Sequence, residues 1–117
     1  MSGLSRERFL TTLLVLGAGA CGPPVRGTIG AVLLRRTSGR VFIRDVPEHL
    51  AAYRAGIRPG DELLLVEGQD VRRLSDEDLS RVLSGRVDEV VRLTLVRGRE
   101  VLRLEVRRSM AEPYRLE

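Results

Sequence analysis

The chain has no lysine and little of several other residue types. All 20 of its basic residues are arginine, and tryptophan is absent. Without lysine there is no Ser–Lys dyad, no Schiff-base lysine and no phosphate-loop lysine. Aromatic residues make up only 3% of the chain. We therefore expect an aliphatic core, and the composition argues against stacked bases or an aromatic cage.

Cysteine and histidine each occur once. A single cysteine excludes an intramolecular disulfide, and one cysteine with one histidine does not make a zinc site. His49 falls at an expected exposed helix start with no partner in sight. We therefore predict that the chain is not an enzyme and has no catalytic residue, metal or cofactor.

Charge of one sign does not dominate the chain. Sixteen acidic residues are interspersed among the arginines, and the net charge is +4. The densest run of arginine lies on an alternating hairpin, a pattern typical of a solvated face, so we predict no nucleic-acid partner. These arginines are Arg97, Arg99, Arg103, Arg107 and Arg108. The 117 residues, 43% hydrophobic and 31% charged, suit one small ordered domain.

The beginning of the chain has the outline of a secretory signal peptide. Arg6 and Arg8 precede an apolar stretch over residues 9–16, which is shorter than the roughly 20 residues that span a bilayer. Small residues then lead to Cys21, and Ala-Gly-Ala-Cys at 18–21 resembles the lipobox of bacterial lipoproteins.

That resemblance implies a lipoprotein-type signal peptide at 1–20, a lipid on Cys21 and a proline-rich tether at 21–26. It implies an exported protein, lipid-anchored in the bacterial cell envelope. No acid follows Cys21 directly, which favours the outer over the inner membrane by analogy with lipoprotein sorting. Two alternatives stay open: a plain signal peptide cleaved near Ala20, which leaves a free thiol, and an uncleaved start.

Hydrophobic periodicity predicts one domain over residues 27–108 and a flexible tail over 109–117. Strands are expected at 31–34, 41–43, 63–66, 91–95 and 102–106. A short helix is expected at 49–54, and a longer one at 75–84 with Ser75 as its N-cap.

The most informative segment is residues 55–68, Ala-Gly-Ile-Arg-Pro-Gly-Asp-Glu-Leu-Leu-Leu-Val-Glu-Gly. Pro59 and Gly60 suit the central positions of a type II turn. The Asp61 carboxylate can accept hydrogen bonds from nearby backbone amides, and a buried strand is expected to follow. The segment closely resembles the centre of PDZ domains, in particular those of carboxyl-terminal processing and high-temperature-requirement proteases. The resemblance implies an α+β fold: a small PDZ-like antiparallel β-sandwich or partial barrel with one short and one longer helix.

The resemblance also implies a peptide-binding site. The opening Gly-Thr-Ile-Gly-Ala-Val is similar to the carboxylate-binding loop of such domains, and Gly30 would let successive N–H groups converge on an anion. A peptide would add as an antiparallel strand and place its last side chain against the longer helix, with Asp76 or Glu77 at the rim. The peptide-binding residues implied are Thr28, Ile29, Gly30, Ala31, Val32, Leu33, Leu79, Val82 and Leu83.

The implied function is a membrane-tethered module that binds peptide or protein C-termini, with a separate envelope protease or secretion machine as a further partner. The alternative is a non-catalytic structural adaptor of such a complex. An adaptor would hold a fixed protein partner through an internal loop or the sheet edge. The apolar lining predicts a small apolar terminal residue such as alanine, valine or leucine.

Overall fold

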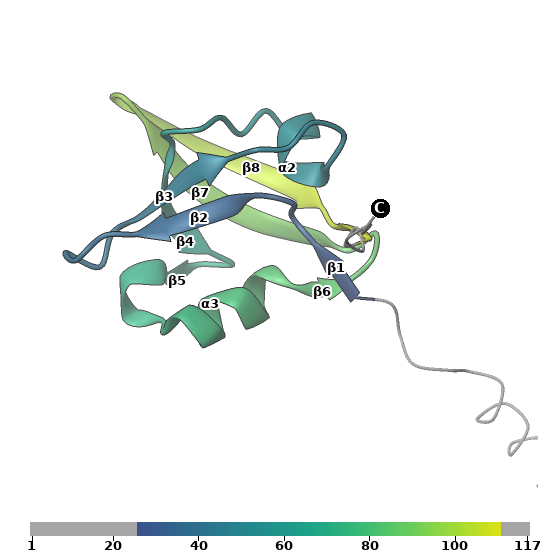
Figure 1. The fold of residues 1–117 in the computed structure, drawn as a ribbon, viewed down its shortest axis with the longest axis horizontal. Helices are drawn as coiled ribbons and strands as arrows, with labels where there is room; N and C mark the ends of the chain where they lie inside the picture. Colours follow the sequence, from purple (N-terminus) through teal and green to yellow (C-terminus); the bar gives the residue numbers. More distant parts are fainter. Residues whose placement is uncertain (1–25, 111–117) are drawn as a thin grey trace, which may run out of the picture.

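The computed structural model describes residues 26–110, which form two antiparallel sheets and two α-helices (Figure 1). This confirms the expected α+β class, with one short and one longer helix. The strands are β1 (Arg26–Thr28), β2 (Val32–Arg35), β3 (Val41–Asp45), β4 (Glu62–Val66), β5 (Gln69–Asp70), β6 (Gly85–Arg86), β7 (Val90–Arg97), β8 (Glu100–Arg107) and β9 (Ser109–Met110). The helices are α2 (Ala51–Arg54), the 3-10 helix η1 (Val71–Arg73) and α3 (Asp76–Leu83).

The larger sheet has the strand order β2-β3-β4-β7-β8, and β5 pairs with β4. Its edge strands are therefore β2 and β8. A smaller sheet, β6-β1-β9, brings both ends of the described chain together. In Figure 1 the helix α2 lies beside β8, whereas α3 lies on the opposite side of the strands.

The core is aliphatic, as expected from the composition. Alternate residues of β7 are buried, namely Val91, Leu93 and Leu95, because successive side chains of a strand point to opposite faces. Isoleucine, valine and leucine from other strands, from loops, from η1 and from α3, together with two alanines of α2, complete one cluster.

The turn before β4 has the predicted geometry. The N–H of Asp61 donates to the carbonyl of Arg58 over 3.2 Å, which closes a four-residue turn. Gly60 lies at its third position with φ +96°, as a type II turn requires. Its own N–H donates to the Ile43 carbonyl at 2.8 Å and ties the turn to β3.

Two predicted boundaries differ from the structure. The helix expected at 49–54 begins only at Ala51, because His49 has φ +75° and Leu50 is extended, neither of which is helical. Strand β1 begins at Arg26 and strand β9 spans Ser109–Met110, so secondary structure extends one residue before and two residues beyond the domain expected at 27–108. Strands this short carry no alternating pattern, and their pairing is decided by tertiary contacts. Residues 111–117 of the expected tail lie outside the described residues.

The expected signal peptide at 1–20, the expected lipidation site at Cys21 and most of the expected tether lie outside the described residues. Within residues 26–110, the helices are too short and polar to include a membrane-spanning one.

Candidate functional site

A groove of about 320 Å³ runs between the edge strand β2 and the helix α3. One wall comes from β1, β2 and the loop between them, and the other from the face of α3. Val41 of the neighbouring strand β3 also lines it. The residues of the two walls are Thr28, Ile29, Ala31, Leu33 and Arg35, and Asp76, Leu79, Ser80, Leu83 and Ser84.

The loop from Thr28 to Ala31 turns sharply at Gly30, where φ is +70°. A Cβ atom on Gly30 would lie 2.5 Å from the Cβ of Leu50, so the turn depends on glycine both for conformation and for space. The carbonyl of Ile29 accepts a hydrogen bond from the N–H of Ala52 at 2.6 Å. The loop is therefore fastened to α2 on the side away from α3.

The loop is expected to present successive free N–H groups to a carboxylate, and one of these groups is not free. The N–H of Gly30 donates to the Oγ1 of Thr28 at 2.8 Å, because the hydroxyl two residues back lies within reach of the turn. Within residues 26–110, the N–H groups of Ile29 and Ala31 donate to no protein oxygen. The N–H groups of Ile29 and Ala31 are thus open to an anion, whereas that of Gly30 is already bonded.

The helix α3 begins where the sequence predicts. The Oγ of Ser75 accepts a hydrogen bond from the N–H of Asp78 at 3.0 Å, which satisfies one of the unpaired amides of the first turn. Leu79 and Leu83 are 5% and 7% exposed, so they belong to the core and also line the groove. Ser80 is exposed on the groove wall between them.

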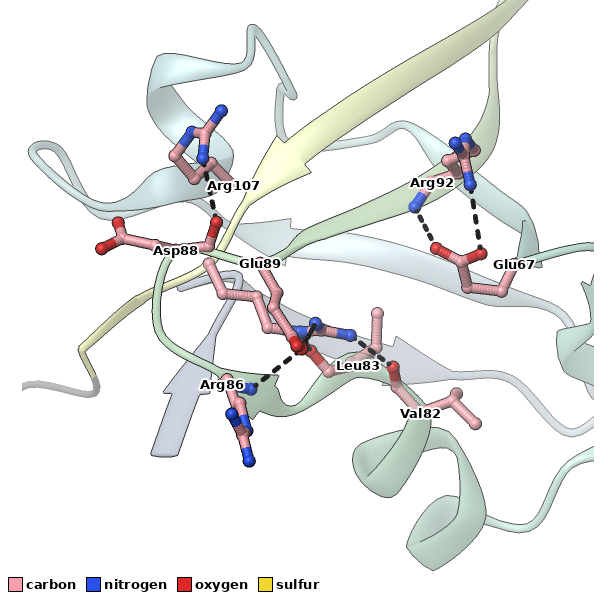
Figure 2. Close-up of polar contacts among 9 residues, drawn as sticks. Glu67, Val82, Leu83, Arg86, Asp88, Glu89, Arg92 and Arg107 are labelled. Carbon is pink, nitrogen blue, oxygen red and sulfur yellow. Dashed lines mark hydrogen bonds and ion pairs between the residues drawn. The ribbon is translucent and has the colours of Figure 1, made fainter. Parts of the chain in front are cut away.

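The other end of α3 is held by Arg108. This arginine is 8% exposed, and it donates to the carbonyls of Leu83 at 2.9 Å and Val82 at 3.2 Å. Figure 2 shows these two carbonyls at the end of the helix, with Glu89 close to them. A cation at this position satisfies carbonyls that have no helical partner. Arg108 is thus a structural residue that fixes α3, and the prediction that it lies on a solvated face is wrong.

The hairpin arginines differ among themselves in a way that the sequence does not reveal. Arg107 is exposed and donates to the carbonyl of Asp88 at 2.9 Å, as Figure 2 shows. Figure 2 also shows the neighbouring surface pair Arg92–Glu67. Arg97, by contrast, lies over Asp61, which is 2% exposed. Together with Arg108, three of the five hairpin arginines are therefore held by contacts within the protein.

The Asp61 carboxylate is the centre of the turn before β4. Its two oxygens accept from Nε and Nη2 of Arg97, each at 2.9 Å, and one also accepts from the N–H of Arg58 at 2.9 Å. Burial by itself raises the pKa of Asp61. The bonds from Arg97 and Arg58 outweigh burial, so its pKa lies below the usual value.

The structure brings most of the predicted binding residues to the groove, though not all. Thr28, Ile29, Ala31, Leu33, Leu79 and Leu83 line it. Gly30 packs against Leu50, and Val32 is 44% exposed. Val82 does not line the groove, and its carbonyl accepts from Arg108.

Sequence reasoning missed Arg35, Val41, Ser80 and Ser84 as groove residues. Two signals would have found most of them. Arg35 is two residues beyond Leu33 on a strand, and Ser80 and Ser84 are four and eight residues beyond Asp76 on a helix, so each shares a face with a groove residue. Asp76 and Glu77 are the two acids expected at the rim of the site. Asp76 lines the groove, whereas Glu77 lies outside the groove.

Within the described part of the chain, the groove lining contains no histidine and no cysteine. Among residues 26–110, no three histidine, cysteine or acidic side chains lie close enough together to hold a metal ion. His49 is exposed, and it lies outside the groove lining. The lining offers apolar surface, hydroxyl groups and one ion pair, which suits binding.

Known proteins resemble the chain in sequence and in fold. The family model of the PDZ domain matches residues 42–97. That range contains β4, α3 and β7, whereas the Thr28–Ala31 loop and β2 lie outside it. The comparison with curated sequences finds no match.

Solved structures share the fold at low sequence identity. A photosystem II D1 C-terminal processing protease is 24% identical with a TM-score of 0.68, over 87% of this chain and 27% of that one. The HtrA-type protease AlgW with a decapeptide is 18% identical with a TM-score of 0.68, over 77% and 31%. The chain thus corresponds to less than a third of the length of either protease.

A third structure corresponds to this chain in size. The PDZ domain of a carboxy-terminal protease from Vibrio cholerae, in complex with a peptide, is 22% identical with a TM-score of 0.64. The match covers 76% of this chain and 98% of that one. The described residues therefore have a PDZ-like α+β fold, and residues 42–97 of that fold match the family model of the PDZ domain.

Proposed function

We propose that this chain, which contains a PDZ domain, binds the C-terminal segments of peptides or proteins in the groove between β2 and α3. A ligand strand would pair with the open edge of β2 and leave its terminal carboxylate at the loop Thr28–Ala31. The observation that carries the proposal is the pair of N–H groups on Ile29 and Ala31, which donate to no oxygen of residues 26–110 and lie at the end of a mostly apolar groove.

The lining favours a small apolar side chain at the end of the ligand. Ile29 of the loop and Leu79 and Leu83 of α3 supply apolar surface to the groove. Alanine, valine or leucine would bury its methyl groups there, at roughly 0.8 kcal/mol for each buried CH₂.

The test of this function is carboxylate dependence. A fluorescent six-residue peptide that ends in valine is titrated against the full chain as the free acid and as the amide. We expect the free acid to bind at least tenfold more tightly, since a charge-assisted hydrogen bond contributes about 1.5–3 kcal/mol. Equal binding of the two peptides would contradict carboxylate capture.

A variant locates the binding in the groove. Ser80→Tyr fills the exposed wall of α3, and we expect it to reduce free-acid binding at least tenfold without loss of helical content. Glu77→Tyr on the same helix is the matched control, because Glu77 is exposed and lies outside the groove. Equal effects of the two variants would place the peptide elsewhere.

A structural adaptor is the second candidate. It is favoured by the bond from Gly30 to the Thr28 hydroxyl, which withholds one amide from a carboxylate. An adaptor would bind a fixed partner through an internal loop or the sheet edge, and free acid and amide peptides would then bind equally. The free-acid proposal has more support, because the other two amides remain open.

We also propose that the chain is exported to the bacterial cell envelope and anchored by lipid on Cys21, with the outer membrane favoured. The support is the sequence of residues 1–21, a signal-peptide outline that ends in a lipobox-like Ala-Gly-Ala-Cys. The bound C-termini would then belong to envelope proteins, and a separate protease or secretion machine would receive them.

This anchor predicts a clear change of location. In a bacterial host, the wild-type chain is expected in the membrane fraction with acyl chains on an N-terminal Cys21, as read by mass spectrometry. Cys21→Ser is expected to abolish lipidation, because serine offers no thiol to the lipid transfer. A mature wild-type chain that begins at another residue, or carries no lipid, would contradict the anchor.

A further inference from the structure

The groove ends, opposite the Thr28–Ala31 loop, at an arginine held in a fixed position. The guanidinium of Arg35 donates to three carbonyls: Gly39 at 3.0 Å, Val71 at 3.3 Å and Leu74 at 2.9 Å. These carbonyls come from the β2–β3 hairpin and from both ends of η1. Its side chain is 23% exposed, so three separate segments fix the cation while part of it still faces the groove.

The ion-pair partner of Arg35 across the groove is Asp76, which is held less firmly than Arg35. The Nε of Arg35 donates to Oδ1 of Asp76 at 2.7 Å, across from β2 to the first residue of α3. The Asp76 side chain is 82% exposed. An ion pair with one partner so exposed contributes little, because water screens the charge and the free side chain has many rotamers. Asp76 is therefore the replaceable member of the pair.

The register of strand addition places a ligand side chain opposite Arg35. If the terminal residue lies opposite Ala31, an antiparallel strand sets its next two inward residues opposite Leu33 and Arg35. Residues directly opposite each other share one face of a sheet. Ala31, Leu33 and Arg35 line the groove, so the ligand side chain four residues before the terminus also faces it.

We infer that the groove selects ligands with an acidic side chain four residues before the C-terminus. This inference rests on the proposed function. The incoming carboxylate takes the place of Asp76 on Arg35, which keeps its three carbonyl contacts. A guanidinium has five N–H groups, and four are used here, so one more is available to a second carboxylate oxygen.

The test uses three free-acid peptides of six residues that end in valine and differ only four residues before the end. They carry glutamate, glutamine or lysine there, and binding to the full chain is measured by fluorescence anisotropy. We expect the glutamate peptide to bind about fivefold more tightly than the glutamine peptide, and the lysine peptide least tightly. Equal affinity of the glutamate and glutamine peptides would overturn the inference.

Two variants separate recognition by Arg35 from a general charge effect. Asp76→Asn removes the competing carboxylate, so the glutamate peptide should bind about two- to threefold more tightly, with the glutamine peptide unchanged. Arg35→Gln should erase the preference for glutamate. If Arg35→Gln does not fold, Asp76→Asn still decides, since weaker glutamate binding to it would show that Asp76 is not a competitor.

A fourth peptide, the glutamine peptide with an amidated C-terminus, distinguishes failure of this inference from failure of the proposed function. A free-acid preference for the glutamine peptide without a glutamate preference would refute only the acidic selection. If no peptide of the series binds, both the selection and the peptide capture are wrong.

Discussion

Replacing Asp61 by asparagine is expected to lower the free energy of unfolding by about 3 kcal/mol. The carboxylate is 2% exposed and receives two bonds from Arg97 and one from the Arg58 amide. Asparagine has one acceptor oxygen where three donors converge, and its NH₂ group would face a cation. Urea unfolding of both proteins at pH 7 measures the difference.

The same substitution has a predictable dependence on pH. The folded protein holds the pKa of Asp61 below its ordinary value of 3.8, so ionised Asp61 favours the folded state. This contribution is complete above that value and is lost as the pH falls through the lower folded pKa. The difference between wild type and Asp61→Asn should be constant from pH 5 to 7 and shrink below about pH 4.

Asp70→Asn is the control for this experiment. Asp70 also pairs with an arginine, Arg72, but both side chains are more exposed, at 29% and 61%. Its substitution should cost much less stability than that of Asp61, because solvent screens the pair. Equal losses from Asp61→Asn and Asp70→Asn would mean that burial of the Asp61–Arg97 pair has no special importance.

Replacing Gly30 by alanine is expected to cost about 3 kcal/mol of stability and to displace the Thr28–Ala31 loop. Positive φ costs a residue with a Cβ atom roughly 1 kcal/mol, and the new Cβ would lie 2.5 Å from that of Leu50. Relief of that overlap requires a backbone shift, at about 1–3 kcal/mol. Urea unfolding gives the loss, and free-acid peptide binding should weaken along with it.

Gly98→Ala measures the cost of positive φ without an overlap like that between Gly30 and Leu50. Gly98 has φ +63°, close to that of Gly30, and no atom lies within 4 Å of the position its Cβ would take. It should cost only about 1 kcal/mol. Leu50→Gly combined with Gly30→Ala should then show a favourable coupling of about 1–2 kcal/mol, since it removes the Leu50 Cβ that the new Cβ would overlap. Equal costs at Gly30 and Gly98 would mean that Leu50 does not crowd the loop.

Local chemistry was enough to predict the parts of the fold that short segments determine. Pro59 and Gly60 specify a type II turn through φ alone, and Ser75 caps α3 through a hydroxyl three residues from its donor. The alternation of β7 and β8 likewise follows from a repeat of two residues. Such features depend on residues that are neighbours in the sequence, so the sequence alone predicts them.

Features that join distant segments could not be predicted in this way. Arg97 meets Asp61 across 36 positions, and Arg35 meets Asp76 across 41. Many arginines of this chain look equivalent in sequence, and only the folded arrangement decides which are buried. The sheet β6-β1-β9 has the same origin, since strands of two or three residues show no period.

The candidate site was predictable in outline and wrong in detail. The Thr28–Ala31 loop and α3 were identified, because Gly30 and the spacing of Leu79 and Leu83 mark them. The bond from Gly30 to the Thr28 hydroxyl and the turn of Val82 away from the groove were not, because both depend on exact side-chain direction. The apolar spacing that marks Leu79 and Leu83 does not mark Ser80, because its side chain is polar.

The most direct test of peptide capture is a map of backbone amide NMR shifts during titration with the free-acid valine peptide. The groove predicts the largest changes at Ile29, Ala31 and Leu33, with smaller ones along α3 at Ser80 and Leu83. Changes confined to the opposite sheet edge at β8, with the amides of Ile29 and Ala31 unmoved, would contradict binding between β2 and α3.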